Sequence, residues 1–349
     1  MTAMQTRTGL AGTLLVLLTT LAACGTPHYT IDADVPHSGG RFPSGADAFQ
    51  FAIVGDRTGG HRPGVFEHAV EQINLLQPEF VVGVGDLIEG YSDDRQKLER
   101  EWQEFDAIVQ RLDMPFFYTV GNHDIGNQLS HELWRERYGR DYYAFKYRDV
   151  LFLSLNTEDP PVILPPEALA GQARLEAMMR EDPAGVMEML RKRRAETGAA
   201  TAPPRLPGSV AISSAQVDWV AATLARHADA RWTIVLMHKP AWDYNSAAFA
   251  RIEELLADRP YTVIAGHEHY YNYTRRQDRD YITMATTGGI WLSEEGGAFD
   301  HIAWVTMTGN GPLITNIALC GLLGTPEQTQ ELITSEQADR FCLRPAAMP

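Results

Sequence analysis

The sequence predicts an α/β fold, and two observations carry this prediction. From Phe49 onward, short apolar runs alternate with longer amphipathic stretches, as in folds whose helices cover a buried sheet. Residues able to bind metal ions follow directly after five of these runs. Open α/β sheets bind their ligands at the carboxyl ends of the strands, so we expect these residues to meet at one edge.

The apolar runs are short and continuous, which is typical of strands buried on both faces. They lie at residues 51–54, 80–84, 116–120, 150–155, 232–237 and 261–265, and a further β-rich segment spans 281–318. Helices are predicted at residues 63–76, 93–112, 130–138 and 214–225. The first of these opens with a proline, and the last follows Ser213, a favourable N-cap residue.

Residues 157–211 interrupt this alternation. Proline-rich stretches flank a helical pattern at 167–197, so we predict an insertion into the domain. Two interpretations stay open at this point: the insertion overhangs the site and selects the substrate, or it is a solvated decoration without a role.

The N-terminus predicts export. The apolar run at residues 10–18 follows Arg7 and is too short for a membrane-spanning helix, so residues 1–23 are predicted to be a signal peptide. Residues 21–25, Leu-Ala-Ala-Cys-Gly, resemble the bacterial lipobox. This resemblance implies a lipid on Cys24 and a place in the cell envelope, at the periplasmic face of the outer membrane because Gly25 follows the cysteine. The alternative is a plain signal peptide with an incidental cysteine.

Two further segments flank the expected domain. Residues 24–47 lack apolar periodicity and are predicted to be a flexible tether, and residues 320–349 are predicted to be a C-terminal extension. Cys320 and Cys342 belong to a chain expected to reach an oxidising compartment, which favours a disulfide between them. Two separate buried thiols are the alternative.

The residues at the strand ends suit divalent cations. The net charge of −15 argues against a nucleic-acid surface and against long-range attraction of phosphate substrates. Any attraction for a phosphoryl group therefore has to be local, and bound cations can supply it. Carboxylates, amides and imidazoles are ligands for hard and borderline cations, and a carboxylate can bridge two of them. The motifs are Gly55-Asp56, Gly85-Asp86, Gly121-Asn122-His123-Asp124, His238 and Gly266-His267-Glu268-His269.

This ordered set of motifs resembles the signature of the calcineurin-like metallophosphoesterases, over residues 49–310. The resemblance implies a domain at residues 48–319 built as a four-layer α/β sandwich, in which helices flank two central mixed sheets. It also implies two divalent metal ions, chosen from Mn, Fe, Zn and Mg. Asp86 is implied to bridge them. The other implied ligands are Asp56 and His269 for the first ion, and Asn122, His238 and His267 for the second.

The activity implied by the resemblance is hydrolysis of a phosphomonoester or phosphodiester, with a metal-bridging hydroxide as the nucleophile. His123 is implied to act outside the coordination shell by protonating the leaving oxygen, and Asp124 to orient its ring. The alternative is a lipoprotein that binds phosphate-bearing ligands without hydrolysing them. We favour the enzyme because a binding protein has no need of His123 and Asp124.

One position departs from the family pattern. The first motif is usually Asp-x-His, and here Thr58 stands in place of that histidine. Purple acid phosphatases, a branch of the same superfamily, also lack it and use a tyrosine three residues after the bridging aspartate, where this chain has Glu89. We therefore predict that Glu89 binds the first ion, in a colourless site. His61 is the second candidate, and a water or the Thr58 hydroxyl is the third.

Overall fold

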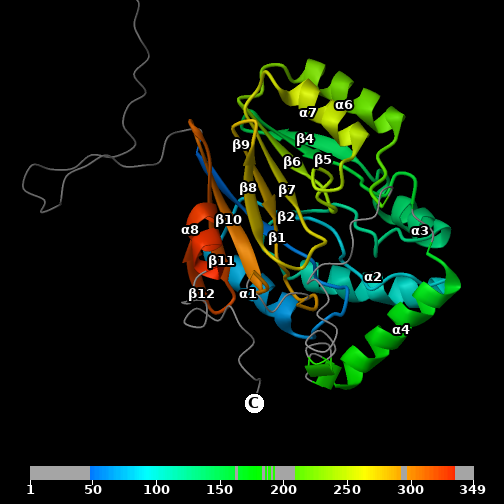
Figure 1. Ribbon diagram of the computed structural model, residues 1–349. Helices are drawn as coiled ribbons and strands as arrows, with labels where there is room; N and C mark the ends of the chain where they lie inside the picture. Colours follow the sequence, from blue (N-terminus) through cyan, green and yellow to red (C-terminus); the bar gives the residue numbers. More distant parts are fainter. Residues whose placement is uncertain are drawn as a thin grey trace, which may run out of the picture. The chain divides into compact units, whose positions relative to one another are not determined.

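Two six-stranded sheets form the centre of the molecule (Figure 1). The structure is a computed structural model, and it describes residues 48–161, 164–182, 185–186, 188–189, 192, 209–291 and 297–334. The predicted signal peptide, the whole predicted tether with Cys24, and Cys342 lie outside these residues. Because Cys342 lies outside them, the disulfide predicted between Cys320 and Cys342 stays a prediction.

The first sheet has the strand order β12-β11-β10-β1-β2-β3. Strand β1 pairs in parallel with β2, with Ala52 opposite Val81, and antiparallel with β10. The sheet is therefore mixed. Its strands are β1 (Phe49–Val54), β2 (Val81–Gly83), β3 (Phe116–Phe117), β10 (His301–Thr308), β11 (Gly311–Ala318) and β12 (Gly321–Gly324).

The second sheet has the strand order β4-β5-β6-β7-β9-β8. Its four central strands are parallel to one another, and both edge strands are antiparallel to their neighbours. This sheet is also mixed. Its strands are β4 (Tyr143–Tyr147), β5 (Val150–Ser154), β6 (Trp232–Leu236), β7 (Tyr261–Ala265), β8 (Asn272–Arg276) and β9 (Arg279–Thr283).

Aromatic and branched side chains from both sheets fill the space between them. The rings of Phe51 and Phe80 stack with centroids 5.2 Å apart, and the ring of Phe152 from the second sheet meets Phe51 edge-on at the same distance. Burying each of these rings stabilises the fold by ~1.5–3 kcal/mol. The two sheets are thus held together by their shared apolar core.

Helices cover the outer face of each sheet. Helices α1 (Val65–Leu76) and α2 (Arg95–Val109) pack on the first sheet, together with α3 (Gln128–Tyr138). Helices α6 (Ser214–Arg226) and α7 (Ala247–Leu256) pack on the second sheet. This arrangement confirms the predicted four-layer α/β sandwich of two mixed sheets flanked by helices.

Short polar side chains cap the starts of α2, α3, α6 and α7. The Asp94 carboxylate accepts a hydrogen bond from the backbone N–H of Gln96 at the start of α2, and Ser213 does the same for Gln216 in α6. Such caps satisfy backbone donors that the helix leaves unpaired, and losing one costs about 1 kcal/mol. The capping position predicted for Ser213 is confirmed.

The predicted boundary at residue 319 is too early. Strand β12 adds an edge to the first sheet, and helix α8 (Pro326–Ile333) follows it. The Thr329 hydroxyl is buried and accepts a hydrogen bond from the Asn316 side chain at 3.1 Å, and Ile333 belongs to the core between the sheets. The domain therefore continues into the segment that was predicted to be an extension.

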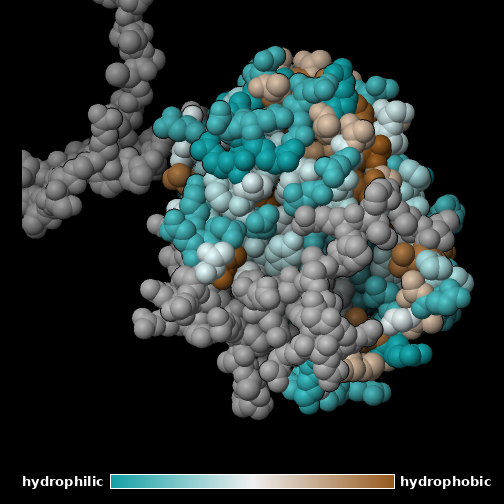
Figure 2. Space-filling view, viewed as in Figure 1, coloured by the Kyte–Doolittle hydropathy of each residue, from teal (hydrophilic) through white to brown (hydrophobic). Residues whose placement is uncertain are grey.

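The described surface is mostly polar. Its exposed large apolar side chains are Leu75, Leu76, Met189 and Leu313, which lie in three separate parts of the chain. In Figure 2, hydrophilic side chains predominate on the face drawn, and hydrophobic ones form small separate groups. None of the described helices has both the length and the apolar character that crossing a bilayer requires.

His301 is expected to make the fold sensitive to acid. Its buried ring accepts a hydrogen bond from the backbone N–H of Ala285 (3.1 Å) and donates one to the side-chain oxygen of Asn316 (3.0 Å). Burial lowers the pKa of His301 to about 3. Below about pH 6.5 the unfolded chain binds a proton that the folded chain excludes, so stability falls by ~2 kcal/mol between pH 8 and pH 5.

Urea unfolding of the metal-free protein at these two pH values tests this contribution. The variant His301→Gln can keep one donor and one acceptor and does not titrate, so its stability should depend less on pH by that amount. Equal pH dependence in the two proteins would contradict the assignment.

Candidate metal centre

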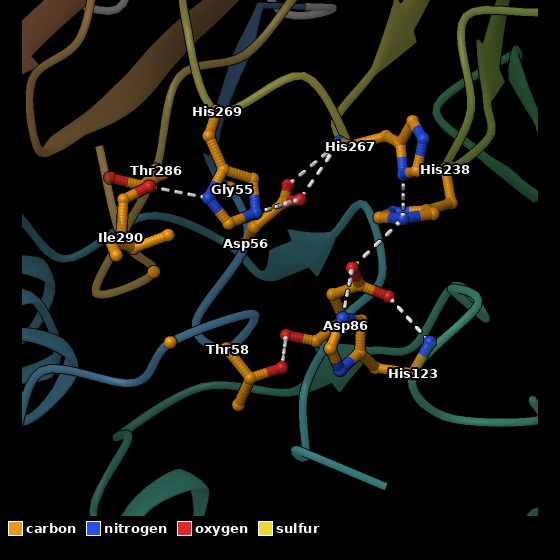
Figure 3. A network of polar contacts seen from close by, with 12 residues as sticks. Gly55, Asp56, Thr58, Asp86, His123, His238, His267, His269, Thr286 and Ile290 are labelled. Atoms are coloured by element: carbon orange, nitrogen blue, oxygen red, sulfur yellow. Dashed lines mark hydrogen bonds and ion pairs between the residues drawn. The ribbon is translucent and has the colours of Figure 1, made fainter. Parts of the chain in front are cut away.

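The candidate ligands lie on loops at the carboxyl ends of strands from both sheets (Figure 3). Asp56 and Asp86 follow β1 and β2 of the first sheet. His238 follows β6 of the second sheet, and His267 and His269 follow β7. The structure brings all five together, as expected for residues at the carboxyl edge of parallel strands.

Two glycines leave space for the carboxylates. A Cβ atom on Gly121 would lie 2.2 Å from Oδ1 of Asp86, and one on Gly266 would lie 2.2 Å from Oδ1 of Asp56. Both distances are far below van der Waals contact, so a larger residue at either place would displace a carboxylate. This explains why a glycine opens the third and the last motif.

One cluster of donor atoms surrounds the ring of His238. Its Nε2 atom lies 3.1 Å from Oδ2 of Asp86, 3.0 Å from Oδ1 of Asn122 and 3.2 Å from Nδ1 of His267. Its Nδ1 atom donates to the backbone carbonyl of Val84 at 3.0 Å. That hydrogen bond orients the ring and leaves Nε2 as the atom that can bind a cation, as in known metal sites.

A second cluster shares Asp86 with the first. Potential ligand atoms of Asp56, Asp86 and His269 all lie within 4.8 Å of one another. Nε2 of His269 is 3.2 Å from Oδ2 of Asp56, and Nδ1 of His269 donates to the carbonyl of Ile290 at 2.5 Å. The same pattern recurs here: a backbone carbonyl holds one ring nitrogen and directs the other into the cluster.

The pKa values of Asp86 and His238 also suit a site that binds a cation. Burial alone would raise the pKa of Asp86, but the neighbouring His238 and His123 rings hold it well below its usual range. Burial opposes the charged form of His238, yet the Asp86 carboxylate raises the pKa of His238 to about 9. Asp86 and His238 thus favour their charged forms 3.1 Å apart, and a cation bound between them would replace the imidazolium proton.

Comparison with known proteins agrees with this geometry. A family model described as calcineurin-like phosphoesterase matches residues 49–271, which is more than half of the chain. The chain belongs to the calcineurin-like phosphoesterase family. This family uses two divalent metal ions, and the two clusters supply candidate ligands for both. The predicted cofactor is confirmed to that extent.

Individual relatives match this chain over shorter stretches. Rat serine/threonine-protein phosphatase CPPED1 is 37% identical over 99 residues, and the human protein is 35% identical over the same length. These stretches cover 26% of this chain and 31% of each relative. The chain thus matches less than two thirds of the length of these curated relatives.

Two solved structures share the fold of this chain. Purple acid phosphatase PPD1 from yellow lupin (Lupinus luteus) has a TM-score of 0.51 at 13% identity, covering 80% of this chain and 52% of that one. The structure of PhoD has a TM-score of 0.50 at 12% identity, covering 82% and 72%. At these identities the likeness concerns the fold.

Asp124 has a different partner from the one expected. Its carboxylate accepts hydrogen bonds from the backbone N–H groups of four residues, at 2.8 to 3.2 Å, and thereby joins the loop after β2 to the loop after β3. The His123 ring instead donates through Nδ1 to the backbone carbonyl of Glu89 at 2.7 Å. The expectation that Asp124 orients the His123 ring is therefore corrected: Asp124 holds the backbone, and Glu89 orients the ring. The four donors are Asp86, Leu87, Ile88 and Gly121.

Several residues of the centre have a left-handed backbone. Positive φ angles occur at Asp86 (54°), Tyr91 (42°), His267 (73°) and His269 (55°). Aspartate and histidine adopt this region more readily than most residues, but each instance still costs about 1–3 kcal/mol. The surrounding hydrogen bonds are needed to keep these backbones in place.

The replacement ligand stays a prediction. Glu89 lies outside both clusters, and its Oε1 atom accepts from the backbone N–H groups of Gly60 (3.1 Å) and His61 (2.6 Å). Burial and the nearby Arg57 lower the pKa of His61 to about 3, and its Nε2 atom has no hydrogen-bond partner among the described residues. The Thr58 hydroxyl lies within hydrogen-bonding distance of the carbonyls of Asp86 and Ile88.

Glu89→Ala and His61→Ala separate these candidates. If Glu89 is the ligand, its variant should lose one of two bound metal equivalents and most activity, while His61→Ala has a milder effect. Elemental analysis of the purified variants, with circular dichroism to check the fold, measures both. Two retained equivalents in Glu89→Ala would show that Glu89 is not the ligand.

Sequence reasoning missed Tyr91. Its hydroxyl accepts a hydrogen bond from Nδ2 of Asn122 at 2.8 Å, which points the other end of that amide, Oδ1, at His238. The Tyr91 ring also lies edge-on to His123, with centroids 4.7 Å apart. Gly90-Tyr91 follows the second motif closely, but no local pattern shows that its hydroxyl meets the third motif.

A pocket of about 500 Å³ has Tyr244 in its wall and none of the candidate ligands. Its walls come from residues 159–160 and 210–213, which are the two ends of the insertion, and from residues 243–248 after His238. Tyr244 links pocket and centre, because its ring centroid lies 6.2 Å from that of His267 and its hydroxyl donates to Glu268 at 3.0 Å.

Proposed function

We propose that this protein hydrolyses phosphoesters at the paired clusters, in a reaction that depends on divalent metal. The single observation that carries the proposal is the position of Asp86, whose carboxylate belongs to both clusters. Phosphoester hydrolysis is the chemistry of the family to which the chain belongs. When bound, the two ions would polarise phosphoryl oxygens and lower the pKa of an attacking water.

His123 is the proposed proton donor. Because Nδ1 donates to the carbonyl of Glu89, the other nitrogen, Nε2, is left to face the centre, 4.0 Å from Oδ2 of Asp86. A protonated ring in this position can hydrogen-bond to the leaving oxygen and transfer its proton as the ester bond breaks. Glu89 supports this role through its backbone carbonyl.

The pocket beside Tyr244 is the proposed site for the leaving group. Pockets of this size accommodate a small organic group. The described residues that line it include Asp159 and Asp243 and no lysine or arginine. A leaving group with a second phosphate is therefore expected to bind poorly, and one with hydroxyl or amino groups is expected to bind better.

Hydrolysis assays with added manganese test the proposal. The panel should contain an aryl phosphate monoester, an aryl phosphate diester, and alkyl phosphates with and without a second phosphate. Turnover that disappears with chelator and returns with metal supports the enzyme. Binding of phosphate-bearing ligands without turnover, for every metal and ester, would favour the alternative of a non-catalytic binding protein.

We also propose that a lipid on Cys24 anchors the protein in the cell envelope, at the periplasmic face of the outer membrane. The motif around Cys24 supports this proposal. One acyl chain holds a protein only weakly at a membrane, whereas several chains hold it stably.

Cys24→Ser should convert a membrane-bound protein into a soluble or uncleaved one. Membrane fractionation and intact mass measurement give the location and the attached lipid. A wild-type protein found without lipid in the soluble periplasmic fraction would contradict the proposal.

A further inference from the structure

Helix α4 (Pro166–Glu181) of the insertion is not a solvated decoration. Its residue Met179 is 1% exposed, although most of the helix faces solvent. Met179 forms one apolar cluster with Val186, also in the insertion, and with Ile290. Ile290 lies more than a hundred positions later in the chain, in the loop beside the metal centre (Figure 3).

The first line of contacts runs from the apolar cluster around Met179 to His269 and Asp56, the candidate ligands of one ion. The carbonyl of Ile290 accepts the hydrogen bond from Nδ1 of His269, which directs Nε2 of that ring to Asp56. The Ile290 side chain also lies against Gly60, where an added Cβ would come within 2.8 Å of it. The Ile290 side chain is thus enclosed by the insertion on one side and by the loop after β1 on the other.

The second line of contacts runs from α4 to Asn122, a candidate ligand of the other ion. Glu176 of α4 forms an ion pair with Lys97 of α2 at 3.0 Å, and Lys97 pairs with Glu101 at 2.7 Å. The other oxygen of Glu101 accepts from the backbone N–H of Gly90 at 2.9 Å. Gly90 precedes Tyr91, whose hydroxyl holds the Asn122 amide.

We propose that α4 is a positioning element for both metal sites. Through Ile290 it fixes the orientation of His269, and through Lys97 and Glu101 it fixes the loop that presents Tyr91 to Asn122. Figure 1 shows α4 lying below α2 and oblique to it in this view, and the ion pair between Glu176 and Lys97 joins the two helices. The inference builds on the proposed function, because it assumes that the clusters bind metal. Partners that orient metal ligands typically change affinity by about 10–100-fold when lost.

The first line of contacts is tested by titrating the metal-free protein with manganese. The electron paramagnetic resonance signal of free Mn²⁺ gives the dissociation constant of each site. Met179→Ala should weaken one of the two sites by about tenfold and leave the other unchanged. Excess manganese should restore kcat, because His269 itself is still present. The matched control is Met307→Ala, which shortens an equally buried methionine in the core between the sheets. It should lower the free energy of unfolding without changing either dissociation constant.

Glu176→Gln tests the second line and keeps the proposal testable if Met179→Ala fails to fold. It removes the charge that meets Lys97 and should weaken the other metal site. Its control is Arg180→Gln, because Arg180 is the second ion-pair partner of Glu176, at 2.9 Å, and lies at the surface. Wild-type dissociation constants at both sites in Met179→Ala and Glu176→Gln would overturn the proposal. If the wild type binds two ions but hydrolyses no ester, the proposed function fails, and these constants still decide the role of α4.

Discussion

Asp86→Asn is expected to remove hydrolysis almost completely. Asp86 is the one residue shared by both clusters, and its negative charge would offset the positive charge of two bound cations. An asparagine has a similar shape and can still accept the backbone N–H of His123, but it lacks the charge that holds two cations together. If each ion contributes several kcal/mol to stabilising the transition state, kcat/KM should fall by a factor of ~10³ or more.

Elemental analysis alongside the assay shows whether the lost activity follows lost metal. Asp141→Asn is the matched control, because Asp141 is also a buried carboxylate in contact with a histidine, at 2.5 Å from Nε2 of His131. That pair lies outside both clusters, so the control should keep its metal and its activity. An Asp86→Asn variant with more than about a tenth of wild-type kcat/KM would contradict the bridging role.

His123→Ala should lower kcat while both metal equivalents are retained. A general acid contributes roughly 10²–10⁴-fold to a rate, and His123 belongs to neither cluster. The loss should depend on the leaving group. Hydrolysis of an alkyl phosphate needs the proton, so its rate should fall by the full factor. A nitrophenyl phosphate releases nitrophenolate, which is a stable anion, so its rate should fall much less.

Comparing the two esters separates proton donation from a structural effect. His131→Ala is the control, since His131 is a buried histidine paired with Asp141 and not with the centre. It should affect both esters equally and slightly. An equal loss for both esters in His123→Ala, or a loss of metal, would show that His123 does something other than donate a proton.

The sequence predicts the central strands and places the candidate ligands after them because both depend on local patterns. Each buried strand is a continuous apolar run, and each ligand follows such a run directly. The glycines before Asn122 and His267 belong to the same pattern, since they leave space for the carboxylates of Asp86 and Asp56. The family signature therefore contains both the ligands and part of the space around them.

The partners of these ligands are harder to predict, because they are contacts between distant segments. Asp124 stands next to His123 in the sequence, yet its carboxylate is used by backbone donors of the preceding loop. Backbone carbonyls orient His238 and His269, and every residue has such a carbonyl, so no residue type identifies it. Helix α7 is also missing from the sequence prediction, although the Ser246 hydroxyl accepts a hydrogen bond from the backbone N–H of Phe249 at its start.

The left-handed backbone of the ligand residues limits how this protein can evolve greater stability. At Asp86, His267 and His269 the backbone would be most relaxed with glycine, but glycine has no side chain to bind a cation. The substitution that relieves strain is therefore the one that destroys the centre, at three positions at once. Selection for heat resistance is confined to other parts of the chain, such as the helix caps and the core between the sheets, and the strain at the centre is inherited unchanged.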